Sequence, residues 1–97
     1  MARALIVDDD PTGARLVRKY LQRSGHDVVI RSDGRAGLER ALSDPPDLVI
    51  LDVMLPGMGG LEVCRALRAA EATRDLPVIF LSARSDLGDR VAGLDQG

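Results

Sequence analysis

Four short runs of aliphatic residues divide the chain and do most to limit the folds open to it. They occupy residues 4–7, 28–30, 48–51 and 78–81, and longer stretches with helical spacing of apolar residues follow them. Short, wholly apolar strands are typical of a parallel sheet that is covered on both faces. Their alternation with helices is typical of β-α-β units. The order of segments therefore predicts an α/β domain built on a parallel sheet.

The stretches between the aliphatic runs carry helix start and stop signals. Asp10 can cap a first helix, Pro11 suits the first helical position, and Gly25 is expected to end that helix. A second helix is expected over roughly residues 34–43, because two prolines stop it soon afterwards. A third helix is expected to carry Val63, Ala66, Leu67 and Ala70, and a last one, capped by Ser85, to carry Leu87, Val91 and Leu94.

Length and charge exclude several classes of function. The 97 residues suffice for one domain, and 13 basic against 15 acidic side chains give a net charge of −2. Such a chain has no positive field to attract nucleic acid or an anionic membrane surface. No apolar run is long enough to cross a membrane, and the first residues lack a signal-peptide layout. We therefore expect a cytoplasmic protein with no membrane or nucleic-acid contact, and we expect the single cysteine, Cys64, to pack in the core.

Acidic and hydroxyl side chains stand where the predicted strands end. The first run leads into Asp8, Asp9 and Asp10, the third into Asp52 and the fourth into Ser82. Parallel strands bring their carboxyl ends to one edge of the sheet, which is where open α/β sheets bind ligands. Neighbouring strands lie about 4.8 Å apart. If the first and third strands are neighbours, their terminal carboxylates should therefore lie close together.

Crowded carboxylates call for a cation. Like charges raise the pKa of at least one member of such a group unless a positive ion joins them. A purely oxygen donor set, without His or Cys, suits Mg²⁺ better than zinc. With much of the charge cancelled, a phosphoryl group could approach, and one of the aspartates could attack it to form an acyl phosphate. The residues alone do not say which aspartate is the nucleophile.

Three segments of the chain, residues 5–11, 48–60 and 77–83, together resemble the receiver domain of two-component response regulators. They read Leu-Ile-Val-Asp-Asp-Asp-Pro, then Leu-Val-Ile-Leu-Asp-Val-Met-Leu-Pro-Gly-Met-Gly-Gly, then Pro-Val-Ile-Phe-Leu-Ser-Ala. The match is collinear over the whole chain. It implies a flavodoxin-like, doubly wound parallel sheet with strand order 2-1-3-4, and a cytoplasmic signalling domain of a phosphorelay instead of an enzyme.

The resemblance also implies a role for each matched residue. Asp52 would accept a phosphoryl group from the phosphohistidine of a histidine kinase. Asp9 and Asp52 would bind Mg²⁺ directly, Asp8 would assist largely through water, and the backbone carbonyl of Met54 would complete the protein's share of the ligands. Ser82 would hydrogen-bond a phosphoryl oxygen and draw its loop inward.

The chain departs from the family pattern at its carboxyl end. A fifth strand, with its lysine, and a fifth helix are missing, and the only lysine present is Lys19 in the first helix. If the lysine acts like an oxyanion-hole donor, its loss would cost on the order of 10² to 10³ in rate. We therefore interpret residues 1–97 as a C-terminally truncated receiver domain from a longer regulator. The exposed edge of the strand at 78–81 would favour self-association or lower stability.

The first helix carries a basic stripe of Arg15, Arg18, Lys19 and Arg23. This stripe either is a solvated face or, by the resemblance, docks a histidine kinase or histidine phosphotransfer protein. His26 is expected to be a solvated turn residue without a role. Gly57, Gly59 and Gly60 are read as turn formers that permit positive φ.

Two other functions compete with the receiver. Residues 8–12 also fit the Asp-x-Asp-x-Thr motif of haloacid dehalogenase-type phosphohydrolases, with Asp8 as nucleophile, Asp10 as general acid and Ser82 in the second motif. That assignment leaves Asp52 without a function. A phosphorylation-independent protein-binding module is the other possibility, favoured by the missing lysine and opposed by the intact acidic set.

Overall fold

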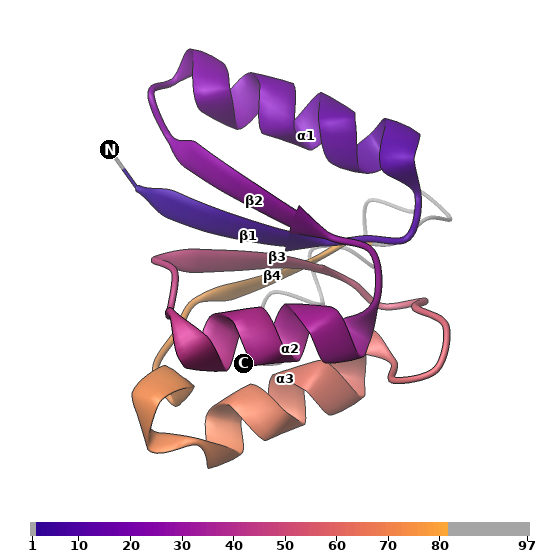
Figure 1. The fold of residues 1–97 in the computed structure, drawn as a ribbon, viewed down its shortest axis with the longest axis vertical. Helices are drawn as coiled ribbons and strands as arrows, with labels where there is room; N and C mark the ends of the chain where they lie inside the picture. Colours follow the sequence, from indigo (N-terminus) through magenta and orange to yellow (C-terminus); the bar gives the residue numbers. More distant parts are fainter. Residues whose placement is uncertain (1, 82–97) are drawn as a thin grey trace.

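Strands and helices alternate along residues 2–81, which are the residues that the computed structural model describes (Figure 1). The strands are β1 (Arg3–Val7), β2 (Asp27–Arg31), β3 (Leu48–Asp52) and β4 (Val78–Leu81). The helices are α1 (Pro11–Arg23), α2 (Gly34–Ser43), α3 (Gly60–Ala69) and the 3₁₀ turn η1 (Glu71–Thr73). Each aliphatic run is a strand, as predicted. The helix expected after Ser85 lies outside the described residues.

All four strands are parallel and stand in the order β2-β1-β3-β4, as predicted. The register pairs Val7 of β1 with Leu51 of β3. The residues that follow this pair, Asp8 and Asp52, therefore leave the sheet at the same edge and on neighbouring strands. The topology thus sets the position of the acidic residues before any side-chain contact is considered.

The sheet is covered on both faces, by α1 on one side and by α2 and α3 on the other (Figure 1). Under α1, Ala14 is buried and Val17 and Leu21 pack against Ile6 and Ile50, so these residues form the face of the helix that covers the sheet. The larger core lies on the face covered by α2 and α3. Its members are Leu5, Val7, Ala41, Val49, Leu51, Leu55, Val63, Cys64, Leu67, Leu76, Val78 and Phe80.

Strand β2 is less buried than its sequence suggested. Its first residue is exposed and the other four are only partly buried, whereas four of the five residues of β3 are fully buried. The cause is position, because among the strands of residues 2–81 β2 pairs with β1 alone and forms the outermost strand on that side of the sheet. An apolar run predicts a strand, but the run does not tell a central strand from an edge strand.

The first helix begins and ends at the predicted residues. The carboxylate of Asp10 accepts a hydrogen bond from the amide of Thr12, and Pro11 occupies the first helical position. Gly25 follows the end of the helix with φ 86°, a conformation that costs little without a Cβ. His26 differs from the prediction, because it is partly buried and its Nδ1 accepts a hydrogen bond from the amide of Ala2 at 2.9 Å.

A clamp made by Arg68 joins α3 to the connection that leads into β4. Its guanidinium donates to the carbonyls of Arg74 at 3.1 Å and Leu76 at 2.6 Å. The hydroxyl of the buried Thr73 donates to the carbonyl of Leu67 at 2.7 Å, which joins η1 to the last turn of α3. The sequence pattern did not predict this turn, because a 3₁₀ segment of three residues has no apolar period of its own.

None of the helices described within residues 2–81 is long and apolar enough to cross a membrane.

The packing of α2 on β1 yields a test of the fold. A Cβ placed on Gly37 would lie 2.5 Å from Cγ2 of Val7. Helix propensity favours alanine over glycine by about 1 kcal/mol, but overpacking a tight contact costs about 1 to 3 kcal/mol. We expect Gly37→Ala to lower the free energy of unfolding, as measured by urea denaturation. The exposed Glu39→Ala on the same helix is the control, and a stabilised Gly37→Ala would contradict the close packing.

Candidate functional site

Three aspartates meet at the carboxyl ends of the central strands. One carboxylate oxygen from each of Asp8, Asp9 and Asp52 can be chosen so that all three atoms lie within 4.8 Å of one another. Asp8 and Asp9 directly follow β1, and Asp52 is the last residue of β3. The closeness expected from parallel strands is therefore confirmed for this acidic cluster.

The cluster is sunk into the edge of the sheet, with only one exposed member. The exposed fraction is 8% for Asp8 and 4% for Asp52, whereas Asp9 faces solvent. Backbone amides hold the two buried carboxylates: the amide of Asp10 donates to Oδ1 of Asp8 at 2.9 Å, and that of Met54 donates to Oδ1 of Asp52 at 3.0 Å. Each amide lies two residues after its acceptor, so both hydrogen bonds belong to the turns that leave the strands.

Burial raises the pKa of Asp52 from its ordinary value to about 6. The largest cause is the loss of water around the charged form. The hydrogen bond from Met54 lowers the pKa, whereas the negative charges of Asp8 and Asp9 raise it. Asp52 is thus a carboxylate whose negative charge is poorly compensated by the protein.

Across residues 2–81, the ion pairs link Arg3 and Arg40 to Asp44 and none involves the acidic cluster. Three clustered oxygen donors without a protein cation, at an open edge of the sheet, are the donor set that a hard divalent ion prefers. The chemistry of these residues therefore fits Mg²⁺, as the sequence suggested.

Asp10, the third member of the sequence triplet, lies outside the acidic cluster. It is exposed, and its Oδ1 accepts the amide hydrogen of Thr12 at 3.1 Å. This arrangement is a helix cap, as predicted. It gives Asp10 a structural function and leaves its carboxylate outside the group formed by Asp8, Asp9 and Asp52.

Ser82 and Met54 are the remaining residues of the predicted site. Ser82 lies outside the described residues, and Leu81 before it pairs with Asp52 in the sheet. Met54 contributes an amide hydrogen to Asp52, and 60% of its surface is exposed. The roles predicted for the hydroxyl of Ser82 and the carbonyl of Met54 stay predictions.

The glycines around the cluster act differently from the sequence interpretation. Of the three read as turn formers, only Gly57 has positive φ, at 69°. Gly60 begins α3, and a Cβ there would lie 2.3 Å from the carbonyl oxygen of Asp52. Gly34 was interpreted from the sequence only as a helix start. A Cβ on it would lie 2.2 Å from the carbonyl oxygen of Met58. These glycines are needed for close approach between segments, a requirement that a single sequence does not distinguish from a turn.

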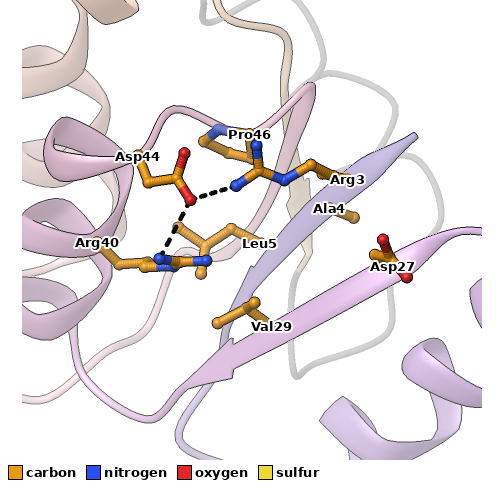
Figure 2. Close-up of a pocket in the computed structure, with 8 residues that line it drawn as sticks. All are labelled: Arg3, Ala4, Leu5, Asp27, Val29, Arg40, Asp44 and Pro46. Carbon is orange, nitrogen blue, oxygen red and sulfur yellow. Dashed lines mark hydrogen bonds and ion pairs between the residues drawn. The ribbon is translucent and has the colours of Figure 1, made fainter.

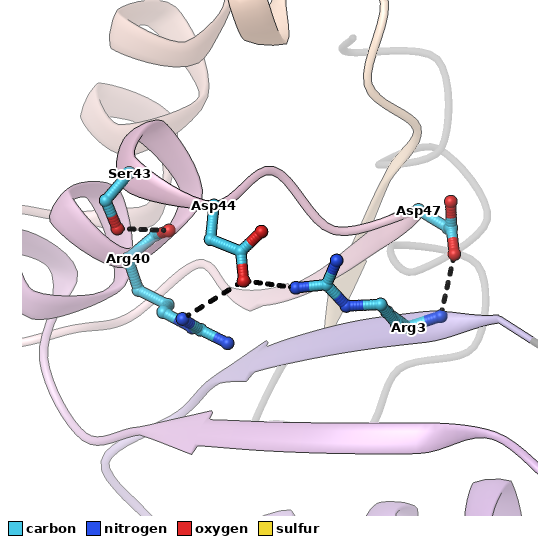
Figure 3. Close-up of polar contacts among 5 residues, drawn as sticks. All are labelled: Arg3, Arg40, Ser43, Asp44 and Asp47. Carbon is cyan, nitrogen blue, oxygen red and sulfur yellow. Dashed lines mark hydrogen bonds and ion pairs between the residues drawn. The ribbon is translucent and has the colours of Figure 1, made fainter.

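A small cavity lies at the other end of the sheet, near the first residues of β1 and β2 (Figure 2). It measures about 30 Å³, which leaves room for about one water molecule. Its arginines are already engaged: Asp44 accepts from Arg3 and lies 3.4 Å from Nη1 of Arg40, and Asp47 accepts the amide of Arg3 at 2.8 Å (Figure 3). This network joins β1 to the end of α2 and holds no free cation for a ligand.

Comparison with known proteins agrees with the site. The family model for the response regulator receiver domain matches residues 4–97. Response regulator ArlR of Staphylococcus saprophyticus is 46% identical over 97 residues, which are 100% of this chain and 43% of that protein. The chain thus spans less than half the length of this curated relative.

Solved structures give the same result. A putative response regulator from Chloroflexus aurantiacus has a TM-score of 0.88 and 34% identity, and the match covers 99% of this chain and 79% of that one. The BeF3-activated N-terminal receiver domain of Klebsiella pneumoniae RstA has a TM-score of 0.80 and 33% identity, with 98% and 79% covered. The acidic cluster, the strand order and these matches lead to one conclusion: the chain belongs to the family of response regulator receiver domains.

Proposed function

We propose that this receiver domain accepts a phosphoryl group on Asp52. The observation that carries the proposal is the position of a buried carboxylate beside two others at the carboxyl edge of the sheet. Asp52 is the most buried of the three aspartates. Its backbone is fixed by β3 and its side chain by the amide of Met54. The domain is a signalling module, and the chemistry proposed for it is modification of its own side chain instead of turnover of a substrate.

Mg²⁺ would be held by Asp8, Asp9, Asp52 and the backbone carbonyl of Met54. When bound, the ion supplies positive charge that offsets the carboxylates and the oxygens of an incoming phosphoryl group. The protein's own residues do the rest. Turn amides fix Asp8 and Asp52, and exposed Asp9 leaves the cluster open to solvent.

The transfer step is a substitution at phosphorus. A carboxylate oxygen of Asp52 attacks the phosphorus of a phosphohistidine, an O–P bond forms and the P–N bond breaks. The imidazole leaves with the electron pair of that bond and takes up a proton. The product is an acyl phosphate on Asp52, and Ser82 is proposed to donate a hydrogen bond to one of its phosphoryl oxygens.

The proposed phosphodonor is a histidine kinase or a histidine phosphotransfer protein that docks on α1. Leu16 and Tyr20 lie one turn apart on this helix and expose 55% and 63% of their surface. Exposed Arg15, Lys19 and Arg23 flank this patch. An apolar patch with a basic border favours a partner helix that presents apolar and acidic side chains.

The phosphohydrolase alternative is disfavoured by the local structure. It needs Asp8 as nucleophile and Asp10 as general acid, yet Asp10 caps α1 and stands outside the acidic cluster. The binding-module alternative differs from our proposal in requiring neither Mg²⁺ nor phosphorylation. The experiments below separate all three functions.

Other parts of the proposal concern the protein as a whole. A location in the cytoplasm, membership of a longer regulator and the absence of nucleic-acid contact by this domain stay predictions. Self-association through β4 also stays a prediction. Among the described residues, this strand pairs with β3 alone.

Phosphoryl trapping tests the proposed acceptor. With Mg²⁺ and acetyl phosphate, mass spectrometry should find one phosphoryl group on Asp52, and Asp52→Asn should abolish it. Asp10→Asn is the matched control, because asparagine caps a helix as well as aspartate does and the substitution removes one charge near the cluster. Modification at Asp8 would support the phosphohydrolase. A chain that neither takes up the label nor binds Mg²⁺ near Asp52 would support the binding module.

The raised pKa of Asp52 predicts a pH-dependent change in stability. Between pH 3.8 and about 6 the folded state holds a proton that the unfolded state has lost, so this carboxyl makes the free energy of unfolding fall as pH rises. Asp52→Asn removes this titrating group and with it the fall in the free energy of unfolding. In EDTA at pH 7 the variant should be more stable on the order of 1 to 3 kcal/mol, and the gain should vanish below pH 4. Denaturation midpoints at both pH values measure this, and an equal gain at both would contradict it.

Substitution on α1 tests the proposed docking surface. Leu16→Glu should lower the rate of transfer from a phosphorylated histidine kinase or phosphotransfer domain by roughly tenfold or more, because a charge replaces a central apolar contact. Labelling by acetyl phosphate should be unchanged, since this small donor does not need a helix to dock on. Leu42→Glu, at an exposed leucine of α2, is the control. Equal transfer rates for both variants would remove α1 from the docking surface.

A further inference from the structure

The loop of residues 53–59 connects the proposed acceptor to α3, and two helices touch it where they carry glycine. At the far end of the loop, a Cβ on Gly60 would lie 2.3 Å from the carbonyl oxygen of Asp52. On its side, a Cβ on Gly34, the first residue of α2, would lie 2.2 Å from the carbonyl oxygen of Met58. A real Cβ atom essentially never lies within 3.0 Å of such a carbonyl oxygen in proteins. The loop is therefore seated where any side chain at these positions would displace it.

Gly34 differs from Gly60 in belonging to an element that the transfer step does not otherwise use. Its φ is not positive, so backbone freedom does not explain the residue. The absence of a side chain lets the first turn of α2 lie against Met58, and the same Cβ on Gly34 would lie 3.0 Å from Cγ2 of Val63. Figure 1 shows α2 beside α3, with the loop at the amino-terminal ends of both helices.

Of the two contacting segments, the loop is the one that would yield to an added Cβ. Helix α2 is held on β1 by the close contact of Gly37 with Val7 and by the fully buried Ala41. At its other end, Asp44 is joined to Arg3 and Arg40 (Figure 3). The loop is irregular and contains Gly57 with positive φ. A clash at Gly34 would therefore move the carbonyl of Met58 more than it would move the helix.

A shift at Met58 has a short path to the acidic cluster. The near end of the loop holds Asp52 through the amide of Met54 at 3.0 Å, and the amide of Gly60 donates to the carbonyl of Val53 at 3.2 Å. Both ends of the loop are thus tied to the residues around Asp52. Only four residues separate Met54 from the far end of the loop.

We propose that Gly34 is a positioning residue for the metal and phosphoacceptor site, acting through the loop of residues 53–59. This inference rests on the proposed function, because it concerns Mg²⁺ held by Asp8, Asp9, Asp52 and the carbonyl of Met54. The bare Cα of Gly34 sets how closely the loop approaches α2, and this seating fixes the backbone of Met54 relative to Asp52.

The test compares Mg²⁺ affinity in two glycine variants by NMR titration of the backbone amides. Loss of a group that orients metal ligands typically costs 10- to 100-fold in affinity. We expect Gly34→Ala to raise the dissociation constant by about tenfold or more and to shift the amide resonance of Met54. The control is Gly25→Ala, whose positive φ makes the substitution destabilising although no atom of the described residues lies within 4 Å of the new Cβ. It should bind Mg²⁺ like the wild type.

The outcomes separate the two levels of the proposal. Equal Mg²⁺ affinity of Gly34→Ala, Gly25→Ala and the wild type would overturn the positioning role while leaving Asp52 as acceptor. A wild-type chain without a Mg²⁺ site would overturn both. If Gly34→Ala does not fold, the unaltered protein decides. Mg²⁺ should then shift the amides of Gly34 and Met54 together and leave that of Gly25 unchanged, whereas an unmoved Gly34 overturns the inference.

Discussion

Parallel pairing of β1 with β3 is the constraint on which the rest of the structure depends. It delivers the carboxylates of Asp8 and Asp52 to the same edge of the sheet although 44 positions separate them in the sequence. The pairing places negative charges together in a partly dry site, which is unfavourable for the isolated chain. The neighbouring turns offset this cost with one backbone amide for each buried carboxylate. Stability is thereby given up at the place where a cation and a phosphoryl group are proposed to bind.

Much of the fold was predictable because its signals are local or periodic. The four aliphatic runs, the cap at Asp10 and the glycine after α1 each follow from the chemistry of a few adjacent residues. Strand order was predictable for another reason, since the resemblance to receiver domains supplied a topology that periodicity alone does not. The partial exposure of β2 escaped prediction because it depends on which strand lies at the edge.

The aspartates of the candidate site were predictable from the sequence, whereas the burial and the backbone contacts around them were less so. The aspartates could be identified because they stand where the aliphatic runs end, and parallel strands bring those ends to the same edge of the sheet. The raised pKa of Asp52 depends on burial, which a sequence does not give in detail. Gly34 and Gly60 each lie close to the backbone of another segment, and such a contact depends on the fold and not on the adjacent residues. In the sequence they therefore looked like an ordinary helix start and an ordinary turn. The prediction for His26 was wrong for the same reason, because its partner is the distant amide of Ala2.

The clamp at Arg68 has a consequence for how freely relatives of this chain can diverge. Its guanidinium binds carbonyl oxygens, which every amino acid possesses, so the exposed connection through Arg74 and Asp75 can change composition while keeping its path. The clamp itself is less easily exchanged, since its hydrogen bonds all come from Nη1 at the end of a long side chain, and a shorter side chain would lose them. Variation should therefore accumulate along the connection and stop at the residue that holds it.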